Sequence, residues 1–175
     1  MISELNLGSI SQLIIPAHWS TLPLERSGRY GSVAQPYALT EDEEVKFMMY
    51  SRGKEVASDI AHDFQVVLAM PPHILTAEEY ATIEVVLRHM SEDDFFERRF
   101  VETQVIDGRS VLVVEGTWKR SGVKNLAVFV DGNGKGSIID EFHFYAPTEK
   151  YDQYLSEGQA IYQSIRFANG DKQSS

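Results

Sequence analysis

The chain has 175 residues, a formal net charge of −10, 43% hydrophobic residues and no cysteine. This length suits one domain with a core of its own, and the apolar content excludes an intrinsically disordered chain. The missing cysteines exclude disulfides, thiolate nucleophiles and cysteine-bound metals, and the acidic balance argues against binding to nucleic acids or anionic membranes.

The beginning of the sequence does not resemble a secretory signal. Glu4 is the first charged residue, no basic residue precedes the apolar stretch that follows it, and that stretch is short. No apolar run in the chain has the length of a membrane-spanning helix. We therefore expect a cytoplasmic protein that does not insert into membranes.

Short apolar runs alternate with Gly- and Pro-rich stretches in the first third of the sequence. Residues 11–19 predict a short strand that ends at Pro16, and residues 44–52 predict another strand. Between them, residues 23–44 have the composition of a loop, with one brief strand near residues 30–33.

The next two segments have different predicted structures. Residues 54–62 suit either a short helix or an extended link. Residues 63–71 predict a strand buried on both faces, because their centre is continuously apolar and a pair of prolines follows it.

The second half has clearer patterns. Residues 76–90 predict an amphipathic helix that starts with a capping box of Thr76 and Glu79. Its apolar face is formed by residues at helical spacing: Tyr80, Ile83, Val86, Leu87 and Met90.

Four strand-like runs follow, joined by short turns, and a second amphipathic helix is predicted over residues 148–165. Asp107 and Gly108 form a two-residue hairpin turn between the first two runs. The pattern predicts an α+β domain over residues 1–167, an antiparallel β-sheet meander flanked by helices, with a flexible tail at 168–175. The four runs are residues 97–107, 109–119, 123–131 and 137–147.

The segment DGNGKGSIIDEF, residues 131–142, resembles a calcium-binding loop. Asp131 and Asn133 match the first two ligand positions, but Lys135 stands at the third and Phe142 replaces the bidentate glutamate. The flanking residues are strand-like rather than helical. We therefore predict a hairpin loop and no metal site.

A row of polar residues on one predicted strand is the candidate for a catalytic or ligand-binding site. Glu141, His143 and Tyr145 alternate along a predicted strand and share one face, so Glu141 could orient His143 as a base if the row lined a cavity. The alternative is the polar side of a half-covered sheet. No other catalytic motif is present, and we expect no enzymatic activity.

An apolar run offers a candidate binding surface. Phe47, Met48, Met49 and Tyr50 lie on a predicted strand, and adjacent methionines suit an adaptable binding face. The alternative is that the methionines fill the core.

Four segments of the sequence resemble those of a known family. They are the hairpin in VIDGRSVLVVEGTW, the segment LAVFVDGNGKGSIIDEFHFYAP, the closing helix YDQYLSEGQAIYQSIRF and the opening LIIPAHW. They are similar to the PsbP-like family of α/β/α sandwich proteins, which includes the DcrB-type proteins. The resemblance implies a sandwich fold and a non-enzymatic role as assembly factor, adaptor or chaperone. Some DcrB-like members escort membrane-inserting segments of type VI secretion effectors.

Three functions are open at this point. The first is a cytoplasmic protein-binding module, an adaptor or chaperone with a link to secretion, which holds a partner segment on a sheet face or groove. The second is a small-ligand binder or hydrolase that uses Glu141, His143 and Tyr145. The third is an acidic immunity or inhibitor protein against a basic partner. We expect a protein partner and no cofactor, and both a monomer and a homodimer fit the sequence.

Overall fold

The computed structural model describes residues 1–27 and 31–168. Its helices are α1 (Ser58–Ala69), α2 (Ala77–Leu87) and α3 (Thr148–Gln163), and a 3₁₀ helix, η1 (Arg88–Ser91), continues α2. The strands of the first half are β1 (Ile2–Leu7), β2 (Ile10–Ile14), β3 (Trp19–Thr21), β4 (Glu25–Ser27), β5 (Ser32–Leu39) and β6 (Asp42–Ser51). Those of the second half are β7 (Phe96–Ile106), β8 (Arg109–Trp118), β9 (Val123–Asp131), β10 (Ile139–Pro147) and β11 (Arg166–Phe167).

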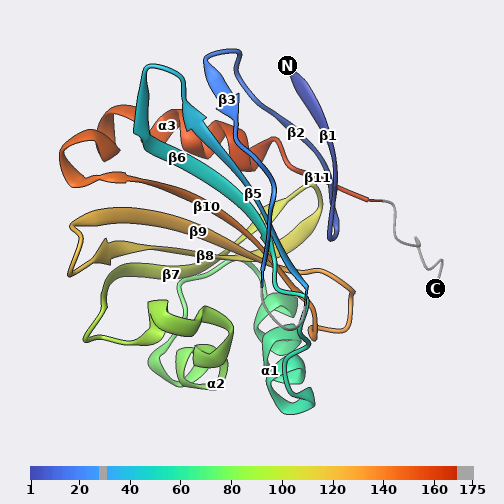
Figure 1. Cartoon of the computed structure of the whole chain (residues 1–175). Coiled ribbons are helices and arrows are strands. Elements are labelled where there is room, and N and C mark those ends of the chain that lie inside the picture. Colours follow the sequence, from blue (N-terminus) through green and yellow to red (C-terminus); the bar gives the residue numbers. More distant parts are fainter. Residues whose placement is uncertain (28–30, 169–175) are drawn as a thin grey trace.

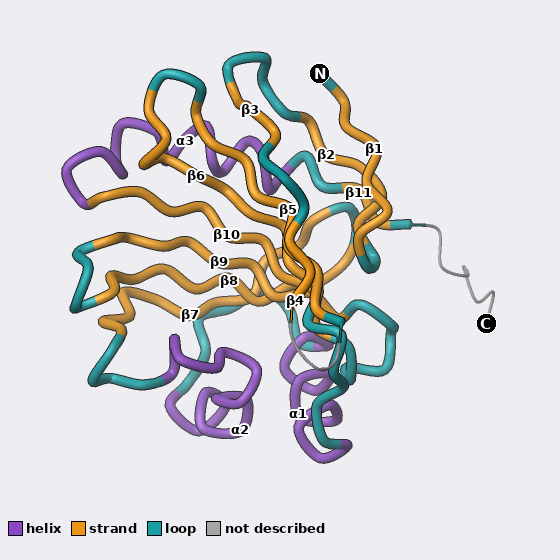
Figure 2. The backbone as a smooth tube through the Cα atoms, viewed as in Figure 1, coloured by secondary structure: helices purple, strands orange, loops and turns teal. Residues whose placement is uncertain are grey.

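Most strands belong to one large antiparallel sheet, with the order β3-β5-β6-β10-β9-β8-β7 and with β4 also paired to β5 (Figure 1). The predicted meander is confirmed, because β7, β8, β9 and β10 are consecutive neighbours. Its first turn is a left-handed pair, with φ of 49° at Asp107 and 75° at Gly108, as a type I′ hairpin requires. In the small sheet, β2 pairs with both β1 and β11 and so joins the two ends of the described chain (Figure 2).

Each face of the large sheet packs against helices, which makes the fold the predicted α/β/α sandwich. Helix α3 covers one face, where Tyr151 and Ile161 join Phe142 and Phe144 of β10 in a buried cluster. Helices α1 and α2 cover part of the other face, where Phe64 and Ile83 pack with residues of β8 and β9 (Figure 1). These helices lie over β7, β8 and β9. On this face, the side chains in the middle of β6 and β10 are therefore less buried than those beneath the helices.

Residues 63–71 do not form the predicted strand, because residues 63–69 belong to α1 and Met70 caps its end. The buried side chains of α1 recur at helical spacing, whereas Val66 points away from the core and is 44% exposed. The prediction was wrong because the consecutive apolar residues at 66–70 fit a buried helix as well as a strand buried on both faces. The buried side chains of the helix are Ala61, Phe64, Val67 and Leu68.

Residues 23–44 are also more regular than predicted, because they contain the eight-residue strand β5. Pro36 is tolerated inside this strand for a local reason. Its carbonyl accepts a hydrogen bond from the Leu22 N–H at 3.0 Å, on the side where β3 gives way to β4. An N–H at this position would point to the same side of β5, between the stretches paired with β3 and β4. The proline therefore removes no hydrogen bond of the sheet.

The predicted tail at 168–175 falls outside the described residues from 169 onward, and the brief strand near 30–33 falls partly outside them at Tyr30. Across the described segments, none of the helices combines the length and the apolar character that a bilayer crossing demands.

Candidate functional site

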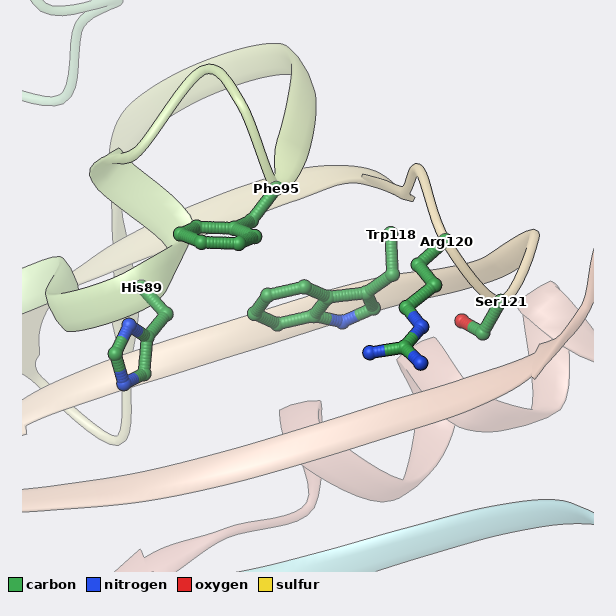
Figure 3. A pocket seen from close by; sticks show the side chains of 5 residues that line it. All are labelled: His89, Phe95, Trp118, Arg120 and Ser121. Atoms are coloured by element: carbon green, nitrogen blue, oxygen red, sulfur yellow. The ribbon is translucent and has the colours of Figure 1, made fainter.

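An apolar pocket of about 630 Å³ opens between the end of α2 and the turn that joins β8 to β9. Its lining residues are His89, Phe95, Trp118, Arg120 and Ser121. The Phe95 ring and the Trp118 indole line the middle of the pocket, with His89 at one end and Arg120 at the other (Figure 3). The aromatic rings supply apolar surface, and the polar groups lie at its two ends.

The first wall of the pocket comes from η1 and the turn after it. The Phe95 N–H donates to the Glu92 carbonyl at 3.0 Å, and the neighbouring Phe96 is fully buried, so Phe95 turns outward and is 53% exposed. Arg98 fixes this wall to the sheet, because its Nη1 donates to the Met90 carbonyl at 3.0 Å.

The second wall comes from the end of β8. The Lys119 N–H donates to the Phe95 carbonyl at 2.9 Å, which joins the two walls directly. The Gly122 N–H donates to the Trp118 carbonyl at 2.8 Å and closes the turn that carries Arg120 and Ser121.

The floor of the pocket is set by Gly116. A Cβ at this position would lie 2.6 Å from the Phe96 ring and 2.3 Å from the Glu97 carbonyl oxygen. The absent side chain lets Phe96 lie against β8, and the Trp118 ring rests on Phe96 with 4.8 Å between ring centres.

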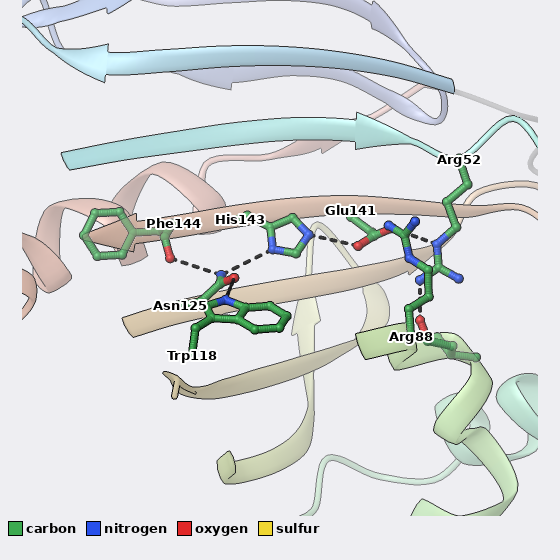
Figure 4. Close-up of polar contacts among 8 residues, drawn as sticks. Arg52, Arg88, Trp118, Asn125, Glu141, His143 and Phe144 are labelled. Carbon is green, nitrogen blue, oxygen red and sulfur yellow. Dashed lines mark hydrogen bonds and ion pairs between the residues drawn. The ribbon is translucent and has the colours of Figure 1, made fainter. Parts of the chain in front are cut away.

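A chain of hydrogen bonds runs from the pocket into the sheet (Figure 4). Trp118 Nε1 donates to Asn125 Oδ1 at 3.1 Å, and an indole N–H can only donate. The amide nitrogen of Asn125 therefore faces His143 Nδ1 at 3.3 Å, which accepts. It follows that His143 carries a proton on Nε2, which donates to Glu141 Oε1 at 2.9 Å.

The chain ends at a carboxylate between two arginines. Glu141 is 1% exposed, and its Oε2 accepts from Arg52 Nε at 2.7 Å and from Arg88 Nη2 at 2.6 Å. Burial alone would raise the pKa of Glu141, but its interactions with His143, Arg52 and Arg88 outweigh burial and lower the pKa to about 2. The carboxylate is thus ionised at neutral pH and fastens α2 to the sheet.

This geometry does not support the predicted base. Both ring nitrogens of His143 are engaged, one by Glu141 and the other by Asn125. Neither nitrogen is free to take a proton from a substrate, and Glu141 and Tyr145 are not among the residues that line the pocket.

The predicted apolar surface is divided between the two faces of the sheet. Phe47 and Met49 are fully buried under α3, so their assignment to a binding surface was wrong, because alternate strand residues point to opposite faces. Met48 and Tyr50 point to the other face, and β6 pairs with β10 so that Met48 lies opposite His143 and Tyr50 opposite Glu141. We call the half-buried residues on this face the open strip: Met48, Tyr50, His143 and Tyr145.

The loop at 131–138 is a hairpin connection between β9 and β10. Asp131 Oδ1 accepts from the Gly136 N–H at 2.8 Å, and Asn133 Oδ1 accepts from the Lys135 N–H at 3.1 Å. These oxygens cap the backbone of the loop itself, as in ordinary Asx turns. Among residues 1–27 and 31–168, no three His, Asp or Glu side chains gather as a metal ion would require.

The sequence reasoning missed the pocket and the arginines. Two signals were present. Phe95 and Phe96 are adjacent at the start of a strand-like run, so one ring is expected to face away from the core. Gly116 interrupts an apolar strand, which indicates a close approach. The contacts of Arg52 and Arg88 with Glu141 join residues 89 and 53 positions apart, and no local pattern indicates such pairs.

Comparison with solved structures finds a cyanobacterial PsbP (CyanoP) from Synechocystis sp. PCC 6803, known from its solution structure. The TM-score is 0.56 and the identity 11%, over 95% of this chain and 96% of that chain. No protein-family model and no curated protein matches the sequence. At this identity the likeness shows the fold alone, and it confirms that the chain has a PsbP-like α+β fold.

Proposed function

We propose that this PsbP-like chain is a non-enzymatic, cytoplasmic protein-binding module, an adaptor or chaperone that holds a segment of a partner protein. One large apolar side chain of the partner would occupy the pocket, and the rest of the segment would lie along the open strip. The observation that carries the proposal is the pocket itself, in which Phe95 and Trp118 present aromatic surface to solvent.

The pocket has the character of an anchor site. Phe95 is 53% exposed although it adjoins a fully buried ring, and Trp118 is held by Phe96 and by Asn125. Aromatic side chains in a preformed hollow contribute much of the energy at protein interfaces, because they bury a large area and lose little conformational freedom.

The open strip extends the same surface. Asn125 of β9 lies opposite both Gly116 of β8 and Tyr145 of β10, so the row from Trp118 to His143 crosses three neighbouring strands. In this row Trp118 packs at the edge of the cluster beneath α1 and α2, Trp118 and His143 are half-buried, and Asn125 between them is buried. An extended or helical segment anchored in the pocket would find contiguous surface there.

Engagement of both nitrogens of His143 favours binding over hydrolysis. A hydrolase built on Glu141 and His143 would need one ring nitrogen directed at its substrate.

A selection from a library of random peptides tests the proposal. Peptides that bind the wild-type chain should contain a large apolar residue, and Phe95→Ala should weaken their binding by roughly tenfold or more. Val85→Ala is the matched control, because Val85 is 55% exposed on α2 and lies outside the pocket. Selected peptides that bind both variants equally would contradict the proposal, as would a selection that yields none.

Positions 95 and 85 also allow a test of the proposal in cells. A photo-crosslinking amino acid at position 95 should capture a defined protein that the same amino acid at position 85 does not capture. Equal products from the two positions would show that the contact is nonspecific.

A further inference from the structure

The pocket has a cationic end without an acidic partner. Arg120 is exposed on the turn after β8, and its guanidinium lies at the end of the Trp118 indole (Figure 3). Within the described part of the chain, no carboxylate pairs with Arg120 and no hydrogen bond engages it. An unpaired guanidinium beside apolar surface is arranged to accept an anion from outside the molecule.

Two of the three acidic residues just before Phe95 are engaged elsewhere, and the third, Asp94, is exposed to solvent. Asp93 pairs with Arg98, and Glu92 Oε1 lies 2.9 Å from His89 Nδ1 at the opposite end of the pocket. The two ends therefore differ in charge. The imidazole and carboxylate of His89 and Glu92 satisfy each other, whereas Arg120 is left available.

We infer that the pocket selects a partner segment in which a large apolar or aromatic residue carries, or directly adjoins, a carboxylate. The apolar side chain lies between Phe95 and Trp118, and the carboxylate pairs with Arg120. The inference rests on the proposed function and names the chemistry of its ligand. It runs against the net charge of −10, which by itself would favour a basic partner.

Short synthetic peptides test the inference directly. One pair is acetyl-Gly-Ser-Leu-Phe with a free C-terminal carboxylate and the same peptide as its amide. A second set is amidated acetyl-Gly-Ser-Phe-Glu-Gly with Gln or Lys in place of Glu. The first pair tests a chain terminus and the second an acidic side chain as the source of the carboxylate.

Titrations followed by NMR, with the indole signal of Trp118 as the reporter, give the affinities. At least one carboxylate peptide should bind the wild-type chain about threefold to tenfold more tightly than its neutral counterpart. This preference should vanish in Arg120→Gln, persist in Lys119→Gln and fade at roughly 1 M salt. Both positions are exposed, so neither variant threatens the fold.

Each other outcome overturns the inference. Equal binding of charged and neutral peptides removes the role of Arg120, and tighter binding of the Lys peptide points to a basic partner. Either result leaves the proposed function standing if Phe95→Ala still weakens binding. Absence of binding by every peptide at millimolar concentration overturns the inference, and the peptide selection then decides the proposed function separately.

Discussion

Trp118 and Asn125 form the contact that joins the apolar pocket to the buried polar chain of the sheet. The indole N–H donates to Asn125 Oδ1 at 3.1 Å, and Asn125 Nδ2 also contacts the Phe144 carbonyl at 3.3 Å. Because the indole can only donate, this one bond fixes the orientation of the amide and then the proton position on His143. The shape of the pocket and the protonation of the network are therefore coupled.

Asn125→Ala should lower the free energy of unfolding by about 1–3 kcal/mol, because it leaves the partly buried Trp118 N–H and His143 Nδ1 without their partner. Urea denaturation measures the loss. In the NMR spectrum, the indole signal of Trp118 should move while that of Trp19, which donates to Glu157 Oε1 at 2.6 Å, stays in place. Gln153→Ala, an exposed amide on α3, is the control and should change stability little. An unmoved Trp118 signal would contradict the network.

Glu141 should make the stability depend on pH at the acid end. Its pKa in the folded chain, about 2, is below the ordinary value of 4.5, so the stabilisation is complete above 4.5 and is lost as the pH falls toward 2. A pKa shift of this size corresponds to roughly 3 kcal/mol in the free energy of unfolding. The difference in unfolding free energy between wild type and Glu141→Gln should therefore shrink by that amount from pH 6 to pH 2.

Denaturant titrations at several pH values measure this dependence. Glu97→Gln removes an exposed carboxylate from β7, and its difference from wild type should stay nearly constant over the same range. A Glu141→Gln difference that does not vary with pH would show that the carboxylate is not ionised in the folded chain.

Arg88 occupies a backbone conformation that favours glycine. Its φ is 52° and its ψ −128° at the C-terminal cap of α2. Arg88→Gly and Arg88→Ala both lose the ion pair with Glu141, but only glycine relieves the strain. We expect the glycine variant to be more stable than the alanine variant by about 1 kcal/mol.

The same two substitutions at Glu84, an exposed position inside α2, should show the opposite order, because glycine is the poorer residue within a helix. Thermal or urea denaturation gives both comparisons. If alanine is the more stable substitution at both positions, the strain at Arg88 is not real.

Tyr151 supports a second buried carboxylate, on the α3 side of the sheet. Its hydroxyl donates to Glu115 Oε2 at 2.9 Å, and Arg99 Nη1 donates to Oε1 at 2.9 Å. Tyr151→Phe leaves Oε2 without a partner and should cost about 1–3 kcal/mol. Tyr154→Phe on the same helix should cost much less, because the Tyr154 hydroxyl is bonded only to exposed Gln153 and the ring keeps its packing. Similar urea midpoints for the two variants would contradict this role of Tyr151.

Much of the fold could be predicted from the sequence, because local signals specify it. The capping box of Thr76 and Glu79 is present, with the Glu79 N–H 3.1 Å from Thr76 Oγ1, and the Asp107-Gly108 turn sets the register of the β7–β8 hairpin. The two errors arose where local patterns are ambiguous. Consecutive apolar residues at 66–70 fit a helix or a strand, and Pro36 is allowed in a strand only because of the gap between its neighbours.

The site was less predictable, for a physical reason. The alternation along β10 placed Glu141 and His143 on one face, and their contact at 2.9 Å agrees with that reading. Whether His143 is free depends on Asn125, 18 positions away, and the charge of Glu141 depends on Arg52 and Arg88 in other elements. A single sequence carries the chemistry of these residues but not their distances.

Gly116 also links stability to the shape of the pocket. A methyl group there would collide with the Glu97 backbone carbonyl and with the Phe96 ring, so the Trp118 indole that rests on Phe96 would also have to move. The pocket would then have a different shape, although position 116 is not among its lining residues. On the proposed function, a partner's affinity for this surface would therefore depend on a residue that the partner never contacts.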